Sequence, residues 1–248
     1  MTTRPALTPD RIVDAAARVA DRGGLTAVSM RHVGQELGVE AMSLYHHISG
    51  KEALLDALAE WVYLRITSPE PTRPWREAME QRAHSAREVL TAHPWALGLI
   101  ESRRSPGPAN LAHHDAVLGN LRTGGFPVRL AAHAYSVLDA YVYGFALTEV
   151  NLPIQTGTDA QEMAAELAAA APTAASTSGT ATTSGPTSTS GAASPAATYP
   201  HLFELMGELI GAGDYTYGSA EFDYGLTLIL DGLDERLRLW TEKSPALG

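Results

Sequence analysis

Apolar residues recur every three or four positions along most of this 248-residue chain. That spacing places them on one face of an α-helix. The first such run follows Thr8-Pro9-Asp10, where a capping hydroxyl, a proline and an acidic residue favour the start of a helix. Gly23-Gly24 is expected to end this helix. Its predicted buried face is Ile12, Ala15, Ala16, Val19 and Ala20.

Three shorter helices are predicted next. Ser29 is the expected N-cap of the second, and Gly38 is expected to end it. The third is predicted over residues 41–47. Ser49, followed three residues later by Glu52, has the pattern of a capping box and predicts the start of a fourth helix. The predicted buried positions are Met30, Val33, Leu37, Leu44, Ile48, Ala53, Leu54, Ala57, Leu58 and Trp61.

Beyond a linker marked by three prolines at 69, 71 and 74, the helical spacing resumes. No convincing alternation of apolar and polar residues is present, so the predicted fold class is all-α. The predicted helical segments lie near 74–92, 95–103, 108–123, 127–150, 158–170, 200–211 and 219–242.

Residues 168–198 interrupt this pattern, because they contain only Ala, Thr, Ser, Gly and Pro. Such a composition buries too little apolar area to offset the entropy of ordering the chain. A disordered low-complexity loop is therefore expected over most of this range. A tolerated surface insertion explains it better than a functional linker does, although both interpretations stay open.

The charge distribution matters more than the net charge of −10. Residues 1–51 carry six Lys or Arg against five Asp or Glu, whereas residues 199–248 carry three against nine. The acidity thus lies away from the N-terminus. A DNA-binding face there has to be local, and its affinity for phosphates should fall with added salt.

Composition also excludes several classes of protein. The chain has no cysteine, which removes disulfides and thiolate chemistry. It has no apolar run of about 18 residues, so no membrane span is expected. The N-terminal MTTRPALTPDR lacks the apolar segment of a secretory signal. These features suit a cytoplasmic protein.

The three short N-terminal helices, with a glycine between the second and third, have the arrangement of a helix-turn-helix. The third helix would then enter the DNA major groove. Methyl groups at its start can contact thymine, and hydroxyl, imidazole and ammonium groups can contact base edges or phosphates. The predicted DNA-binding residues are Arg31, Ala41, Met42, Ser43, Tyr45, His47 and Lys51.

Other interpretations of this segment are weaker. Tyr45 and His46 could pack against the first helix. The adjacent His46 and His47 diverge by about 100° on a helix, which disfavours a shared metal ion. No G-x-S-x-G elbow is present to support a Ser/His/Asp hydrolase. A helical enzyme using His84 or His114-Asp115 for acid–base work is the alternative from another class, and a ligand-binding protein without DNA binding is the third.

The stretch GVEAMSLYHHISGKEALLDAL, residues 38–58, resembles the DNA-binding domain of the TetR family of bacterial transcriptional repressors. The resemblance covers residues 8–61 and is closest to the tetracycline-repressor branch. Ala41 and Met42 stand where tetracycline repressors have a polar residue and a proline, so a shared operator is not expected. The residues that match the family pattern are Arg31, Gly38, Val39, Leu44, Tyr45, His47 and Lys51.

The resemblance implies a homodimer that binds double-stranded DNA. It divides the chain into a helix-turn-helix domain at 1–51, a connecting fourth helix at 52–68, and a ligand-binding and dimerisation domain at 69–248. Segments 127–153 and 222–240 look like the two family helices that form a four-helix bundle between subunits. The predicted intersubunit stripe is Leu226, Ile229, Leu230, Leu233 and Leu237.

The second domain is expected to bind a small organic inducer of unknown identity. Aromatic and Met side chains with a few polar groups suit such a cavity, although each residue could also be ordinary core. No Lys or Arg occurs between Arg129 and Arg236, which favours neutral or cationic compounds, although Arg82, Arg103 or Arg104 could still receive an anion. The candidate ligand-binding residues are His84, Glu101, His114, Tyr135, Asp139, Tyr143, Phe203 and Met206.

The resemblance implies a ligand-responsive repressor, not an enzyme, that needs no cofactor. A magnesium–tetracycline complex is not the expected ligand. The tetracycline branch has a metal-binding histidine just before its seventh helix, and the equivalent segment here, IESRRSPGP, has none. No metal site is therefore predicted.

Overall fold

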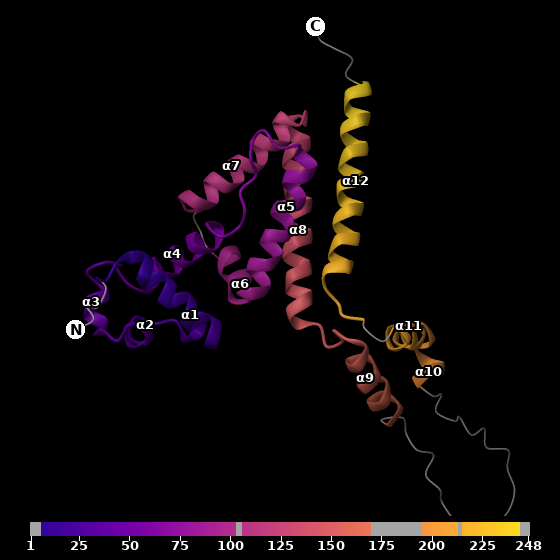
Figure 1. Cartoon of the computed structure of the whole chain (residues 1–248), viewed down its shortest axis with the longest axis horizontal. Coiled ribbons are helices and arrows are strands. Elements are labelled where there is room, and N and C mark those ends of the chain that lie inside the picture. The colour runs from indigo at the N-terminus through magenta and orange to yellow at the C-terminus, as the bar shows by residue number, and fades with distance from the viewer. Residues whose placement is uncertain (1–5, 103–105, 170–194, 213–214, 244–248) are drawn as a thin grey trace, which may run out of the picture. The chain divides into compact units, whose positions relative to one another are not determined.

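The computed structural model describes residues 6–102, 106–169, 195–212 and 215–243. Within these ranges the chain forms helices and no named strand, apart from one isolated bridge between Thr156 and Thr216. The all-α prediction is confirmed (Figure 1). The helices are α1 (Pro9–Ala27), α2 (Met30–Leu37), α3 (Ala41–Leu44), α4 (Lys51–Tyr63), α5 (Trp75–Ala92), α6 (Trp95–Ser102), α7 (Pro108–Thr123), α8 (Val128–Asn151), α9 (Gly157–Ala169), α10 (Pro195–Thr198), α11 (Pro200–Gly211) and α12 (Ser219–Lys243).

The chain forms two compact units. One comprises residues 1–150 with 222–248, and the other comprises residues 151–221. In the described ranges of both units, no helix is long and apolar enough to cross a membrane.

The predicted starts of the first two helices are confirmed. The Thr8 hydroxyl accepts a hydrogen bond from the Arg11 N–H at 3.4 Å, and the Ser29 hydroxyl accepts one from the His32 N–H at 3.2 Å. The regular part of α1 breaks at Gly23 and Gly24, where the backbone leaves helical geometry before one further turn. These local signals hold because each capping group satisfies an N–H that the helix itself leaves without a partner.

Two boundaries differ from the prediction. Helix α3 ends at Leu44, and residues 45–47 form a turn in which the His47 N–H donates to the Leu44 carbonyl at 2.9 Å. Helix α4 has Gly50 at its N-cap rather than Ser49, with no side-chain cap. Gly50 has a φ of 133°, which is unfavourable for residues with a side chain, so the chain turns one residue later than the capping-box pattern predicts.

Polar contacts hold α1 against the helices that follow it. The Asp14 carboxylate accepts a hydrogen bond from the Trp61 indole of α4 at 2.7 Å. The Asp21 carboxylate accepts one from the Trp95 indole of α6 at 2.6 Å and lies 2.7 Å from the His93 ring. Helix α1 is therefore hydrogen-bonded to α4 through Asp14 and to α6 through Asp21.

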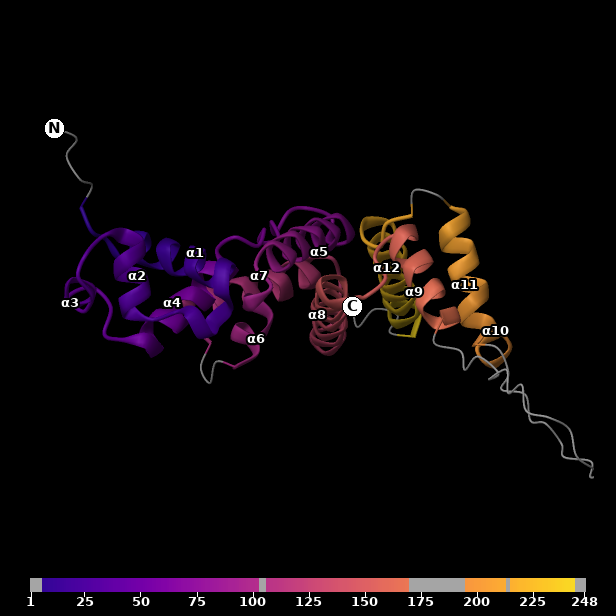
Figure 2. The same ribbon diagram turned by 90° about the horizontal axis from the view of Figure 1, so that it is seen from below.

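Helices α5, α8 and α12 pack together in the first unit (Figures 1 and 2). The Tyr141 hydroxyl of α8 donates to the Phe222 carbonyl at 2.8 Å, and Arg76 of α5 forms ion pairs with Asp231 and Asp234 of α12 at 2.7 and 2.8 Å. Arg87 of α5 is also bonded to α8, through Glu149.

The predicted intersubunit stripe on the last helix needs a correction at three of its five residues, while Ile229 and Leu237 are half-buried. Leu226, Leu230 and Leu233 are 2%, 0% and 7% exposed in the single chain. They belong to the core that α12 forms with its own chain, so they are not free to pack against a partner. Tyr224 and Leu228 on the same helix are 71% and 57% exposed.

In the second unit α9 packs against α11, and Ala160 and Met206 are buried there. The Asp159 carboxylate accepts hydrogen bonds from the N–H groups of Gln155 and Thr156, and these bonds lower its pKa. Most of the predicted low-complexity loop, residues 170–194, lies outside the described residues. The two ends of the predicted 168–198 loop, residues 168–169 and 195–198, are helical.

Candidate DNA-binding face and ligand cavity

Two glycines set the geometry of the helix-turn-helix. Gly38 has a φ of 63°, which lets the chain reverse between α2 and α3. A Cβ on Gly34 would lie 2.9 Å from the Val39 carbonyl oxygen and 3.3 Å from Ala41, so only glycine lets α2 approach the start of α3 this closely. The close packing fixes which side of α3 faces solvent.

The predicted DNA-binding residues surround that outward face. Leu44 and Ile48 are buried beneath it. Met42 is 71% exposed and Tyr45 is 48% exposed, so Tyr45 is not buried against α1. Arg31, His47 and Lys51 are also exposed, while Ala41 and Ser43 are half-buried at the start of α3.

The cations near this face differ in their availability. Glu36 accepts a hydrogen bond from Arg18 at 2.8 Å and another from Arg22, and these bonds lower the pKa of Glu36. The charges of both arginines are thereby partly neutralised. Arg31 and Lys51 form no ion pair with any of the described residues, so their charges remain for an external anion.

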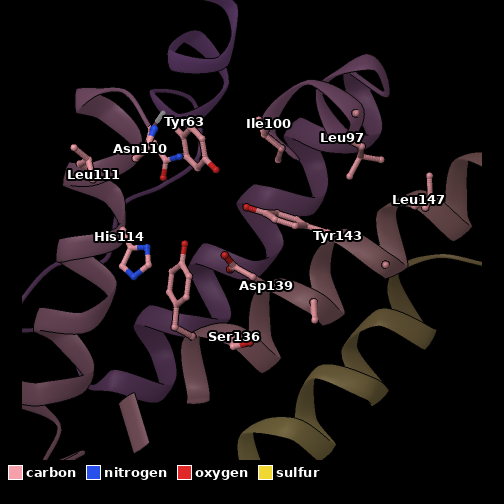
Figure 3. A pocket seen from close by; sticks show the side chains of 15 residues that line it. Tyr63, Leu97, Ile100, Asn110, Leu111, His114, Ser136, Asp139, Tyr143 and Leu147 are labelled. Carbon is pink, nitrogen blue, oxygen red and sulfur yellow. The ribbon is translucent and has the colours of Figure 1, made fainter. Parts of the chain in front are cut away.

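A cavity of about 1140 Å³ lies between α4, α6, α7 and α8 (Figure 3). Leu97 and Leu147 line one end, and Asn110, Leu111 and His114 line the other, with Asp139 and Tyr143 between them. The end with Asn110 and His114 is the more polar of the two. Its lining is Tyr63, Leu97, Gly98, Ile100, Pro106, Asn110, Leu111, His114, Tyr135, Ser136, Asp139, Ala140, Tyr143, Gly144 and Leu147.

Four of the eight predicted ligand-binding residues meet in this cavity. They are His114 on α7, and Tyr135, Asp139 and Tyr143 on α8. The last three lie four residues apart, so they share one face of their helix.

Of the other four candidates, His84 does not line this cavity. His84 faces α12, with its Nε2 3.5 Å from the Asp223 carboxylate and its ring 5.3 Å from that of Phe222. Phe203 and Met206 lie on α11 in the second unit. The side chain of Glu101 lies outside the described residues.

A buried ion pair lies behind the polar end of the cavity. Arg82, only 2% exposed, donates through Nη2 to the Asp139 carboxylate at 2.6 Å and through Nε to His113 Nε2 at 2.8 Å. Burial lowers the pKa of His113 to about 4, and the neighbouring Arg82 charge adds to this. His113 is therefore neutral at pH 7 and carries its proton on Nδ1, since Nε2 accepts from Arg82. Within this cluster the charge of Arg82 is balanced by Asp139.

The cavity itself presents neutral polar groups. Burial, reinforced by the charge of Asp139, raises the pKa of Tyr135 and Tyr143, so both phenols keep their protons. The rings of His114 and Tyr135 stack with centroids 4.0 Å apart. Among the described residues, no partner hydrogen-bonds the Tyr143 hydroxyl or the Asn110 amide, so both can bond to a molecule in the cavity.

Several cavity residues were missed from the sequence. Tyr63 carried no signal beyond its place at the end of a helix. Arg82, which lies behind the lining, was predicted only as a possible partner for an anion. Its position in the sequence did carry a signal for a buried ion pair, because it falls on an apolar face of α5 among small residues, and an arginine there needs a buried partner. The other missed lining residues are Leu97, Gly98, Ile100, Pro106, Asn110, Leu111, Ser136, Ala140, Gly144 and Leu147.

A helix-turn-helix with an outward recognition face, in one unit with a large ligand-sized cavity, defines the class of ligand-sensing DNA-binding regulators. The comparisons with known proteins agree. The family described as "Bacterial regulatory proteins, tetR family" matches residues 12–58, and "Tetracyclin repressor-like, C-terminal domain" matches residues 68–237. The chain belongs to the TetR family of transcriptional regulators.

Individual relatives resemble most of the chain. It is 31% identical over 237 residues to the HTH-type transcriptional repressor DrrR1 of Streptomyces coeruleorubidus, covering 93% of this chain and 78% of the relative. It is 28% identical to the class A tetracycline repressor of Escherichia coli, covering 93% and 92%. The structure of ActR from Streptomyces coelicolor in complex with actinorhodin superposes with a TM-score of 0.65 at 27% identity, covering 94% of this chain and 96% of that one.

Proposed function

We propose that this protein represses transcription as a homodimer bound to a near-palindromic operator, and that an organic ligand in the cavity releases it. One observation carries this proposal. Helix α4 begins with the exposed Lys51 beside the DNA-binding face and ends with Tyr63 in the cavity wall. A helix of 13 residues is about 20 Å long and stiff, so it can transmit a displacement from one site to the other.

The predicted DNA-binding residues make two kinds of contact in this proposal, to base edges and to phosphates. Ala41 and Met42 contact thymine methyls, and Ser43 bonds a base edge or a phosphate. Arg31 bonds a base edge or a phosphate as well. Tyr45, His47 and Lys51 bond phosphates and so set the position of the helix without reading sequence.

The dimer face is formed by exposed apolar side chains on α8 and α12. Val137, Tyr224 and Leu228 are 46%, 71% and 57% exposed, which is costly in water unless a second copy covers them. Two recognition helices about 34–36 Å apart would then read successive major grooves. Leu228→Glu should give monomers with normal helix content, whereas Leu230→Glu should unfold the chain, and sedimentation with circular dichroism measures both.

For the ligand, the cavity favours an aromatic compound with hydroxyl or carbonyl groups. Stacked rings line its wall, and Tyr143 and Asn110 offer hydrogen bonds. Because Asp139 already balances Arg82, the described residues of the wall hold no spare cation for an anionic ligand. The complex of ActR with actinorhodin supports an organic ligand for this chain, and neutral or cationic compounds are the first to test.

The named relatives are transcriptional repressors, which supports a regulator without enzymatic activity. His84 lies outside the cavity, and His114 stacks on Tyr135, so no observation favours acid–base catalysis by either. Because a repressor binds chromosomal DNA, we propose that this protein acts in the cytoplasm.

The test is selection of bound fragments from a pool of genomic DNA, followed by release with candidate compounds. We expect enrichment of an inverted repeat, and release by compounds that also protect the chain from thermal unfolding. Compound binding without any DNA enrichment would favour the alternative of a ligand-binding protein that does not bind DNA. Conversion of a compound during the assay would favour an enzyme.

A further inference from the structure

The N-terminus of α7 is capped by a side chain from another helix. Helix α7 starts at Pro108, and Gly107 at its N-cap has no side chain to satisfy the first free N–H groups. The Ala109 N–H instead donates to the Glu60 carboxylate of α4 at 2.6 Å. A carboxylate is favourable at this end of a helix because the helix dipole is positive there. Helix α4 is therefore bonded to the start of α7.

Gly107 makes room for this contact. A Cβ at this position would lie 2.1 Å from Glu60 Oε1 and 2.4 Å from Glu60 Cδ. The backbone of Gly107, with φ −82° and ψ 176°, is open to every residue type. The carboxylate, rather than the backbone, is what requires glycine here. An alanine at 107 would push away the flexible end of Glu60 and leave the main chain in place.

Both sides of this junction reach the ligand cavity. Tyr63 lies three residues after Glu60, on the same side of α4, and Asn110 directly follows Ala109. A smaller cavity of about 280 Å³ borders the junction and shares Tyr63 and Asn110 with the large one. A molecule that fills the large cavity therefore touches Tyr63 and Asn110, which lie close to the Glu60–Ala109 hydrogen bond on either side of the junction.

We infer that Glu60 is the positioning residue that couples the cavity to the DNA-binding helices, an inference that rests on the proposed function. A ligand that displaces the start of α7 displaces the Glu60 carboxylate with it, and α4 carries that displacement to Lys51 at its other end. Coupling between two sites is reciprocal in free energy. Operator binding must therefore alter the start of α7, even with the cavity empty.

A second route between the same regions exists through Asp21 of α1. Its carboxylate bonds the Trp95 indole of α6 at 2.6 Å, and α6 also lines the cavity. The experiment has to separate the two routes. Substitutions at Glu60 and Gly107 alter the α4–α7 junction and leave Asp21 in place, whereas Asp21→Asn alters the contacts of α1 with His93 and Trp95 and leaves Glu60 in place.

The experiment is hydrogen exchange of the segment 108–114 in the full chain, with and without a selected operator duplex. In the wild type we expect operator binding to change the exchange rate of this segment by about five-fold or more, the lower end of ordinary coupling. Glu60→Ala and Gly107→Ala should each reduce the change to less than about two-fold. Glu60→Gln should keep most of it, because its amide oxygen still accepts from the Ala109 N–H. Glu77→Ala, an exposed acidic residue in the first turn of α5, is the control and should behave as wild type.

The outcomes are distinguishable. A wild-type response in Glu60→Ala together with its loss in Asp21→Asn would overturn the inference and assign the coupling to α1 and α6. A wild type that binds its operator without any response at 108–114 would also overturn it and leave the repressor function standing. If the wild type selects no operator, the proposed function fails first. Gly107→Ala keeps Glu60 in the chain, so a matching loss in both variants marks the contact rather than a folding defect.

Discussion

The DNA-binding face and the ligand cavity differ in whether their cationic side chains have ion-pair partners. Beside α3, Arg31 and Lys51 point to solvent with no ion-pair partner among the described residues. At the cavity, Arg82 is buried and already bonded to Asp139 and His113. The unpaired cations of the first region suit the proposed contact with DNA phosphates. The charges of the second region are paired within the chain, so we propose that ligand recognition there depends on neutral groups such as the Tyr143 hydroxyl.

The largest expected effect comes from removing one partner of the Arg82–Asp139 ion pair behind the cavity. Arg82→Met leaves the Asp139 carboxylate without its counter-charge and His113 without its donor. Removal of one partner of a buried pair costs about 3–5 kcal/mol of unfolding free energy. Urea unfolding of the full chain measures this loss.

Two controls sharpen that result. Arg82→Met with Asp139→Leu removes both charges and should recover most of the lost stability. Arg31→Ala removes an exposed cation and should change the unfolding free energy by no more than about 0.5 kcal/mol. An Arg82→Met protein as stable as the wild type would show that the cavity cluster is as solvated as the DNA-binding face.

Lowering the pH should reduce the unfolding free energy of the chain through the buried His113. Its pKa is about 4 in the folded chain against an ordinary value of 6.5, so folding favours the neutral ring. This contribution to stability is fully present above about pH 6.5 and is lost as the pH falls towards 4. Wild type should lose about 3 kcal/mol more than His113→Gln between pH 7 and pH 4. Equal losses in the two proteins would mean that His113 is already exposed to water.

On the DNA-binding face the expected effects concern binding rather than folding. Met42→Ala should change the preferred base at one position of each half-site, with a cost of about 1–3 kcal/mol for the wild-type operator. Selection from random duplexes measures the preference. If the wild type and the variant return the same consensus, Met42 does not contact a base.

The smallest expected effect is that of a single phosphate contact. Lys51→Ala should weaken binding to every DNA sequence alike and reduce the slope of log affinity against log salt by about one per subunit. Glu77→Ala is the matched control, because it removes a charge far from the DNA-binding face. An unchanged slope for Lys51→Ala would remove its assignment to a phosphate.

The sequence predicted these two regions to different extents, for a physical reason. The DNA-binding face is contiguous, and its geometry follows from short-range rules, such as the cap at Ser29 and the left-handed Gly38. The one misplaced start, at Ser49, arose because Gly50 takes a φ that residues with a side chain avoid. The roles of the individual residues at this face stay predictions.

The cavity combines four helices, and each pattern describes only one helix at a time. Residue type alone selected Tyr135, Asp139 and Tyr143, which the structure brings together on one face of α8. Periodicity describes the faces of a single helix. It gave no information on how α5 is rotated against its neighbours, so His84 was assigned to the cavity although it faces α12. Leu230 was assigned to a partner subunit for the same reason, since an apolar stripe does not show which surface covers it.

The proposed function rests on one claim, that two copies of this chain bind one operator as a dimer. The most direct measurement is fluorescence anisotropy of labelled duplexes that carry either the full inverted repeat or a single half-site of the selected operator. Joining two half-site contacts in one dimer should raise affinity by about 10²–10⁴-fold for the full repeat. Leu228→Glu should reduce this advantage by weakening the dimer. Equal affinity of the wild type for the two duplexes would contradict the account.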